Sequence, residues 1–149
     1  THARQMAAVC TILLHEGVLR TGEWEKLYIC DGEHNGNHVN LQTGEMVVVE
    51  HKMDKYGARR VKLCDETIAA LRPGAGQYLF GGRVSGKTVR ERFDKHIGFT
   101  PAHMRRVSAS IILRLDDASE RDRRADFEGH TIKTMRDEYV IHGEVESTS

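Results

Sequence analysis

The sequence predicts a mixed α+β domain that is mainly helical and carries a small three-stranded antiparallel sheet. Three observations predict it: an amphipathic N-terminal stretch, strand-like segments between turns in the middle, and a series of helical segments after residue 65. The chain has 149 residues, of which 39% are hydrophobic and 30% charged. That is enough apolar material for one hydrophobic core and too little length for two ordinary domains, so we expect one domain.

Each element is predicted from a local pattern. Residues 3–16 place Val9 and Leu13 at helical spacing, and Gly17 follows as a terminator. Residues 39–63 consist of three short strand-like stretches joined by turns at QTG and DKYG, which predicts an antiparallel β-meander. The remaining helices are expected at about 66–72, 88–97, 101–115, 118–127 and 131–142.

Composition also indicates the compartment. Stretches without a charged residue or histidine, such as residues 6–14, are far shorter than the roughly 18 apolar residues of a membrane-spanning helix. The first residues do not resemble a secretory signal. The three cysteines form no C-x-x-C pair, which favours reduced thiols over disulfides. We therefore expect no membrane association and a place in the cytoplasm near the nucleoid, or in the DNA compartment of a host cell.

Charge is unevenly distributed although the formal net charge is zero, with 22 basic and 22 acidic residues. Basic residues dominate residues 52–62 and residues 83–106, whereas residues 137–149 contain acids and no lysine or arginine. A polyanion would meet basic surface if the acids faced elsewhere, so the pattern is compatible with nucleic-acid binding.

Four separated blocks carry polar residues in an informative order. GVLRTGE puts Arg20 three residues after the helix terminator Gly17. HMRR puts His103 and Arg106 on one face of a helix, three residues apart. GHTIKTMRDEY contains a tyrosine nine residues after a histidine. With the basic hairpin MVVVEHKMDKYGARRVKL, these blocks resemble the catalytic domain of the tyrosine recombinase (phage integrase) family over about residues 5–142. The catalytic residues that the resemblance implies are Arg20, Lys52, His103, Arg106, His130 and Tyr139.

The resemblance implies a DNA breaking-rejoining fold and site-specific cleavage and rejoining of DNA, without metal, ATP or another cofactor. Tyr139 would attack phosphorus to form a 3′-phosphotyrosyl intermediate. Arg20 and Arg106 would bind the non-bridging phosphate oxygens, because a planar guanidinium matches them with two parallel hydrogen bonds. Lys52 would protonate the leaving 5′-oxygen, with Lys55 as an alternative, and the two histidines would bind the phosphate or accept the tyrosyl proton.

The resemblance also implies double-stranded DNA as the partner and a homotetramer on paired sites, or a monomer for this piece alone. The residues expected to contact DNA are Lys55, Arg59, Lys87, Arg90, Arg92 and Arg105. Arg105 stands where the family usually has an apolar residue. The expected organisation is a catalytic domain over residues 1–143 and a flexible acidic tail at 144–149. The family usually has an N-terminal DNA-clamping domain, which we expect to be absent from this chain.

Alternative interpretations remain open. Residues 81–88, GGRVSGKT, fit the phosphate-binding pattern G-x-x-x-x-G-K-[ST], but only QYLF precedes them as a strand. Cys30, His34 and His38 have four-residue spacing but lack a fourth zinc ligand, so we expect no metal. DNA relaxation of the type IB topoisomerase kind, or a DNA-binding module without catalysis, are the remaining functional alternatives.

Overall fold

The computed structural model describes residues 2–49 and 58–129. Its helices are α1 (His2–His15), α2 (Thr21–Glu25), α3 (Asp65–Leu71), the short 3₁₀ turn η2 (Arg72–Gly74), α4 (Gly86–His96), α5 (Pro101–Leu113) and α6 (Ala118–Glu128). Its strands are β1 (Tyr28–Cys30), β2 (His38–Asn40), β3 (Glu45–Val48), β4 (Arg59–Lys62) and β5 (Gln77–Tyr78). None of the helices in these ranges is long and apolar enough to cross a membrane.

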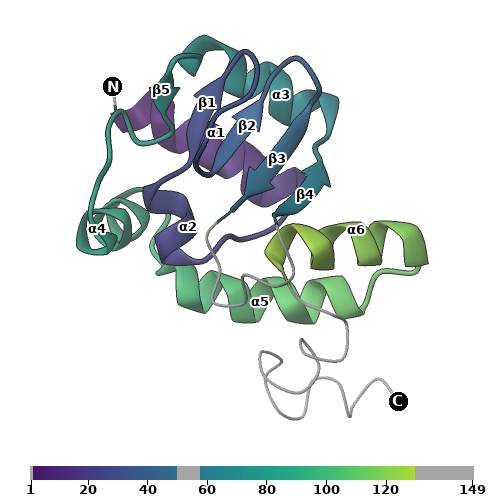
Figure 1. The fold of residues 1–149 in the computed structure, drawn as a ribbon. Helices are drawn as coiled ribbons and strands as arrows, with labels where there is room; N and C mark the ends of the chain where they lie inside the picture. Colours follow the sequence, from purple (N-terminus) through teal and green to yellow (C-terminus); the bar gives the residue numbers. More distant parts are fainter. Residues whose placement is uncertain (1, 50–57, 130–149) are drawn as a thin grey trace.

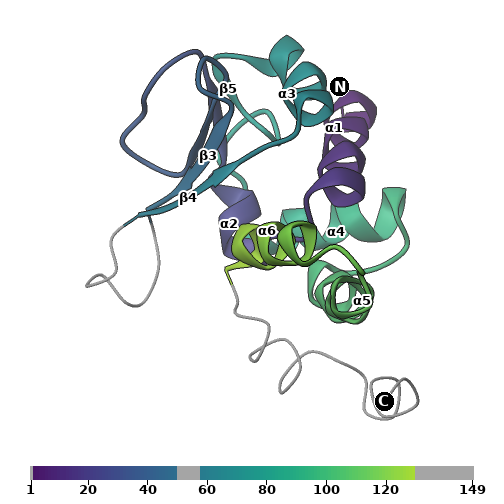
Figure 2. The same ribbon diagram turned by 90° about the vertical axis from the view of Figure 1, so that its right-hand side faces the viewer.

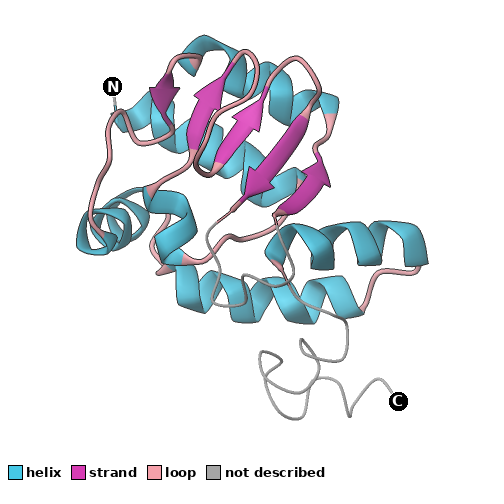
Figure 3. Ribbon diagram, in the orientation of Figure 1, coloured by secondary structure: helices cyan, strands magenta, loops and turns pink. Residues whose placement is uncertain are grey.

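The mixed and mainly helical α+β fold is confirmed (Figures 1 and 3). The predicted meander forms strands β2, β3 and β4, which pair antiparallel, with Met46 opposite both Val39 and Val61. The prediction of three strands is wrong, since the described residues form a five-stranded sheet in the order β4-β3-β2-β1-β5. Strand β1 pairs parallel with β2, and β5 pairs antiparallel with β1. At three and two residues these strands are too short to show an alternating pattern.

Helices α1 and α3 pack together on one face of the sheet, as Figure 2 shows from the side. Met6, Val9 and Ile12 of α1 are buried in a core that also holds Val39 and Met46 of the sheet. These side chains recur at the three- and four-residue spacing that the sequence showed. The core therefore lies between the sheet and α1. Helices α2, α5 and α6 lie beyond the end of the sheet at which β3 ends and β4 begins (Figure 1).

Helix α2 was not predicted and has only five residues. A helix of this length is not stable in isolation, so tertiary packing must hold it. Trp24 supplies that packing, because it is fully buried and its ring lies 5.5 Å from that of Phe93 and 6.5 Å from that of Phe80. The tryptophan thus fixes the direction of the chain immediately after Arg20.

Helix α6 closes the C-terminal end of α1. Glu16 is completely buried and pairs with Arg123, whose guanidinium also donates to the His15 carbonyl at 2.7 Å. Arg124 donates to the Leu14 carbonyl at 3.3 Å. The last carbonyls of a helix have no partner within the helix, so these arginines satisfy them and dock α6 against the core.

Glu120 links these arginines and predicts an acid-sensitive contribution to stability. Its carboxylate lies 2.7 Å from Arg123 and 2.9 Å from Arg124, and the hydrogen bond from Arg123 lowers its pKa from 4.5 to about 2. The ion pairs of Glu120 therefore contribute fully to the free energy of unfolding above pH 4.5, and this contribution is lost as the pH falls toward 2. Because the group is partly exposed, we expect about 1 kcal/mol after screening. Urea unfolding of wild type and Glu120→Gln should differ by this amount at pH 7 and converge near pH 2; a difference independent of pH would contradict the assignment.

Candidate functional site

The C-terminal end of α6 is the point where three other segments of the chain meet. Residues 17–20, helix α5 and the beginning of β4 all make hydrogen bonds to residues 127–128. Helices α5 and α6 run side by side in both ribbon views (Figures 1 and 2). The convergence is notable because Arg20 ends the first segment and His130 follows the last.

A closed ring of hydrogen bonds joins the first of these segments to α5 and α6. The Arg105 guanidinium donates from Nη1 to the Val18 carbonyl at 2.6 Å and from Nη2 to the Glu128 carbonyl at 3.2 Å. The Val18 N–H donates to the Glu128 carboxylate at 2.8 Å, which closes the ring. Arg105 is 4% exposed and Glu128 is 1% exposed. Both backbone groups of Val18 are therefore held, two residues before Arg20.

A second set of bonds fixes Arg20 and the base of β4. Glu23 accepts from the Arg20 backbone N–H at 3.0 Å, which caps the first turn of α2, and its other carboxylate oxygen lies 3.0 Å from Nη1 of Arg59. Arg59 also donates from Nη2 to the Phe127 carbonyl at 3.1 Å. The Glu23 carboxylate thus couples Arg20 to the strand that follows residues 50–57 and, through Arg59, to the end of α6.

Two glycines permit the close approach of these segments. Gly17 lies two residues after α1 with φ of +150°, and a Cβ there would lie 2.8 Å from the Glu128 carboxylate. Gly129 ends α6 in the left-handed conformation, with φ of +78°, and a Cβ there would lie 2.6 Å from Nη1 of Arg59. Any larger residue at either position would displace a member of the polar network.

Gly129→Ala is expected to lower the free energy of unfolding by about 1 to 3 kcal/mol, because alanine is strained at this φ and would push Arg59 away. Gly82→Ala is the matched control, since a Cβ at Gly82 meets nothing within 4 Å. It should change the stability by less than about 0.5 kcal/mol. Chemical denaturation of both variants measures the difference, and equal stabilities would contradict the role given to Gly129.

Three of the predicted catalytic residues lie in the described part of the chain, on two different helical segments. Arg20 lies with an exposed side chain at the start of α2, next to the polar network. His103 and Arg106 are exposed on α5, and the His103 ring stacks on Phe99 with 4.8 Å between the ring centroids. They share the predicted helix, but neither makes a hydrogen bond to the Arg20 segment within the part of the chain that the structure describes. The predicted residues that lie outside that part are Lys52, Lys55, His130 and Tyr139.

A different arginine of α5, Arg105, contacts the segment that ends at Arg20. Arg105 was predicted to contact DNA; in the structure its side chain is buried and its guanidinium donates to the carbonyls of Val18 and Glu128. Arg105 occupies a position that is usually apolar in the resembling family, and its burial agrees with that pattern. The i and i+3 spacing of His103 and Arg106 correctly shows that they share a face, but that face is the exposed one.

The other predicted DNA contacts also differ in environment. Arg59 forms the internal bonds described above, and Arg92 donates to the Phe80 carbonyl at 3.0 Å and to Gln5 at 3.3 Å. Their guanidinium groups therefore stabilise the fold. Lys87 and Arg90 are exposed on α4, where Lys87 lies 3.9 Å from Glu91. These two remain predictions as DNA contacts.

The phosphate-binding loop interpretation does not fit the structure. Strand β5 before residues 81–88 is a two-residue edge strand that pairs antiparallel, whereas such a loop follows a buried strand of a parallel sheet. Ser85 caps α4 by accepting from the Thr88 N–H at 3.2 Å. The Cys30 thiol donates to the Gly32 carbonyl, and no group of three potential metal ligands occurs within residues 2–49 and 58–129.

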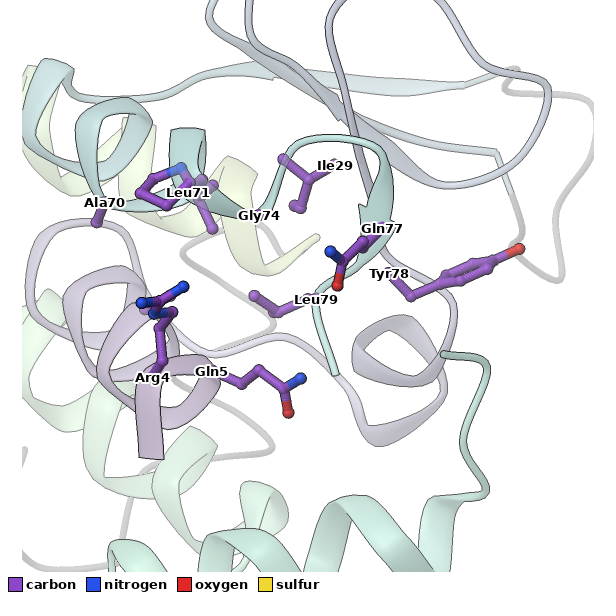
Figure 4. Close-up of a pocket in the computed structure, with 11 residues that line it drawn as sticks. Arg4, Gln5, Ile29, Ala70, Leu71, Gly74, Gln77, Tyr78 and Leu79 are labelled. Atoms are coloured by element: carbon purple, nitrogen blue, oxygen red, sulfur yellow. The ribbon is translucent and has the colours of Figure 1, made fainter. Parts of the chain in front are cut away.

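A separate hollow of about 350 Å³ lies between α1, η2 and β5. Figure 4 shows Arg4, Gln5 and Gln77 around the apolar side chain of Leu79 in its wall. Its lining contains none of the predicted catalytic or DNA-contacting residues. The hollow is therefore distinct from the polar network at the end of α6.

Comparison with known proteins defines the class of fold. No family model matches the sequence, and no curated protein sequence matches it. The structure is similar to the crystal structure of XerA recombinase, with a TM-score of 0.58 and 21% sequence identity. The similarity covers 97% of this chain and 55% of that chain, so this chain spans about half the length of the recombinase. The chain thus has a tyrosine recombinase-like fold.

Proposed function

We propose that this chain is the catalytic domain of a site-specific DNA recombinase that cleaves and rejoins DNA through Tyr139. The observation that supports the proposal most is the convergence at the end of α6. Three of the four blocks that resemble tyrosine recombinases contribute to it: the segment ending at Arg20, helix α5, and the residues just before His130. These blocks are far apart in sequence, and their meeting is required if they serve one phosphate group.

In the proposed reaction the Tyr139 oxygen attacks phosphorus and the bond from phosphorus to the 5′-oxygen breaks. The tyrosyl proton passes to a histidine, for which His130 is the candidate, and Lys52 or Lys55 gives a proton to the departing 5′-oxygen. The phosphotyrosyl bond keeps the energy of the broken bond, so the reverse attack by a 5′-hydroxyl rejoins DNA without ATP. Charge on the non-bridging oxygens must be stabilised by cations already in position.

We infer that Arg20 and Arg105 supply that cationic charge, and that Arg105 has the role that the family resemblance implied for Arg106. Arg105 bonds to the residue two positions before Arg20 and to the residue two positions before His130. Arg106 is exposed and has no such bond in the described part of the chain. A guanidinium has five N–H donors in one plane. In this proposal the Arg105 guanidinium bonds to the two carbonyls and its positive charge also stabilises the phosphate that reacts beside them.

The partner in this proposal is double-stranded DNA. The exposed cations Lys87 and Arg90 lie on α4, which packs against α2 and therefore flanks the helix that begins after Arg20. Such residues would contact phosphates on either side of the cleaved bond. Assembly into a tetramer on paired sites is part of the proposal, because strand exchange needs cleavage of four strands.

A nicked duplex tests the proposal. The probe is a pool of 5′-labelled duplexes with random sequence upstream of a nick, so that cleavage near the nick releases a short fragment and traps the protein on the labelled strand. The reaction contains EDTA and no ATP. A covalent adduct that resists denaturation supports the proposed chemistry, whereas DNA that is bound but never joined to protein would leave a binding module as the correct interpretation.

A further inference from the structure

We propose that Glu128 is a positioning residue that holds the Arg20 segment in its reactive position through the Val18 N–H. The inference rests on the proposed function and adds a residue to it. Glu128 would not touch DNA; it would act on Arg20 through two intervening residues of backbone.

The contacts of Glu128 join two segments that contribute to the site. One oxygen of its carboxylate accepts from the Val18 N–H at 2.8 Å and from the Ser108 hydroxyl at 2.5 Å. Its backbone carbonyl accepts from Arg105 at 3.2 Å. A single buried residue of α6 therefore binds the Arg20 segment directly and α5 through two side chains.

Residues 18–20 depend on these bonds for their position. They lie between α1 and α2 and belong to no strand of the sheet, so no neighbouring strand holds them. A buried N–H needs an acceptor, and for Val18 that acceptor is the Glu128 carboxylate. Removing it would free the peptide that precedes Arg20 by two residues. A displacement of about 1 Å in a group that binds the reacting phosphate can cost about 100-fold in rate.

The surroundings of the carboxylate make its state depend on pH. Burial raises the pKa of Glu128 above its ordinary value of 4.5, while the bonds from Ser108 and Val18 and the charges of Arg105 and Arg124 act in the opposite direction. From β4, the Arg59 guanidinium donates to the carbonyl of Phe127, the residue next to Glu128, so its positive charge lies at the same end of α6. As the pH rises through the raised pKa the carboxyl becomes an anion, which is the stronger acceptor for Val18 and Ser108.

Two substitutions separate positioning from folding. Glu128→Leu fills the same space without an acceptor, and Glu128→Gln keeps a neutral acceptor at every pH. Single-turnover cleavage of the nicked duplex gives a rate constant and an amplitude; partial unfolding lowers the amplitude, whereas misplacement of Arg20 lowers the rate constant. We expect Glu128→Leu to lose about 100-fold in the rate constant. Its amplitude and its affinity for DNA should be unchanged. Glu128→Gln keeps a weaker, neutral acceptor, so at pH 8 its rate constant should lie between those of Glu128→Leu and wild type.

Several outcomes would overturn the inference. A wild-type rate constant in Glu128→Leu, or a fall in amplitude alone, would reduce Glu128 to a structural residue. If Glu128→Leu does not fold, the pH profile decides: the wild-type rate should rise more steeply above pH 4.5 than that of Glu128→Gln, and superimposable profiles would reject the inference. Failure of the wild type itself to form an adduct would instead reject the proposed function.

Discussion

Replacing Arg105 with lysine is expected to slow formation of the DNA adduct by about 100-fold or more, the usual effect of losing one transition-state donor. The same replacement at Arg106 should leave the rate within about threefold of wild type. The difference follows from orientation, since Arg105 is buried against Val18 and Glu128 whereas Arg106 is exposed. Lysine retains the positive charge but cannot bond two carbonyls with one planar group.

The two variants are matched in chemistry and lie on the same helix, so each controls for the other. Circular dichroism first establishes that both are folded, and single-turnover rates are then compared at a temperature well below their unfolding transitions. A slow Arg106→Lys beside a fast Arg105→Lys would return the second cationic role to Arg106 and contradict the geometric argument.

Arg20→Ala is expected to reduce the adduct rate by about 100- to 1000-fold, because it removes a guanidinium from the developing phosphate charge. Its effect on the free energy of unfolding should be below about 0.5 kcal/mol, since the side chain is exposed and the Glu23 cap uses the Arg20 backbone N–H. Loss of activity without loss of stability is the mark of a residue that acts on substrate.

The matched control for Arg20 is Arg60→Ala, which removes one exposed positive charge from β4. It should retain the wild-type rate, with at most a small loss of affinity for DNA at low salt. If both variants lost activity equally, general attraction of DNA by positive charge would explain the data, and no specific role for Arg20 would remain.

The sequence predicted the long helices best, because their apolar spacing repeats over several turns. Ser85, Thr100 and Asp117 each cap the helix that follows by accepting from a backbone N–H, and the observed bounds of α4, α5 and α6 lie within two residues of those expected. Helix α1 was equally accessible from its apolar spacing. Strands β1 and β5 were missed because two or three residues carry no period, and α2 because Trp24 rather than helix propensity stabilises it.

The site was predictable only in part. The blocks around Arg20 and Gly129 do meet in space, as their common resemblance implied. The spacing of residues on one helix, however, does not show which side of the helix is buried. The burial of Arg105 and Glu128 was not predicted, because charged residues are rarely buried unless they are paired. Their partners, Val18 and each other, are distant in sequence, so no local signal marks them.

Transfer of labelled DNA to Tyr139 is the most direct test of the account. Wild-type protein and Tyr139→Phe are incubated with the 5′-labelled nicked duplexes in EDTA without ATP, and the products are denatured, digested with protease and analysed by mass spectrometry. We predict that the wild type yields a peptide in which Tyr139 is joined to the 3′-phosphate of the labelled DNA, and that Tyr139→Phe, which still binds DNA, yields none. An adduct of equal amount in Tyr139→Phe, or one mapped to another residue, would contradict it.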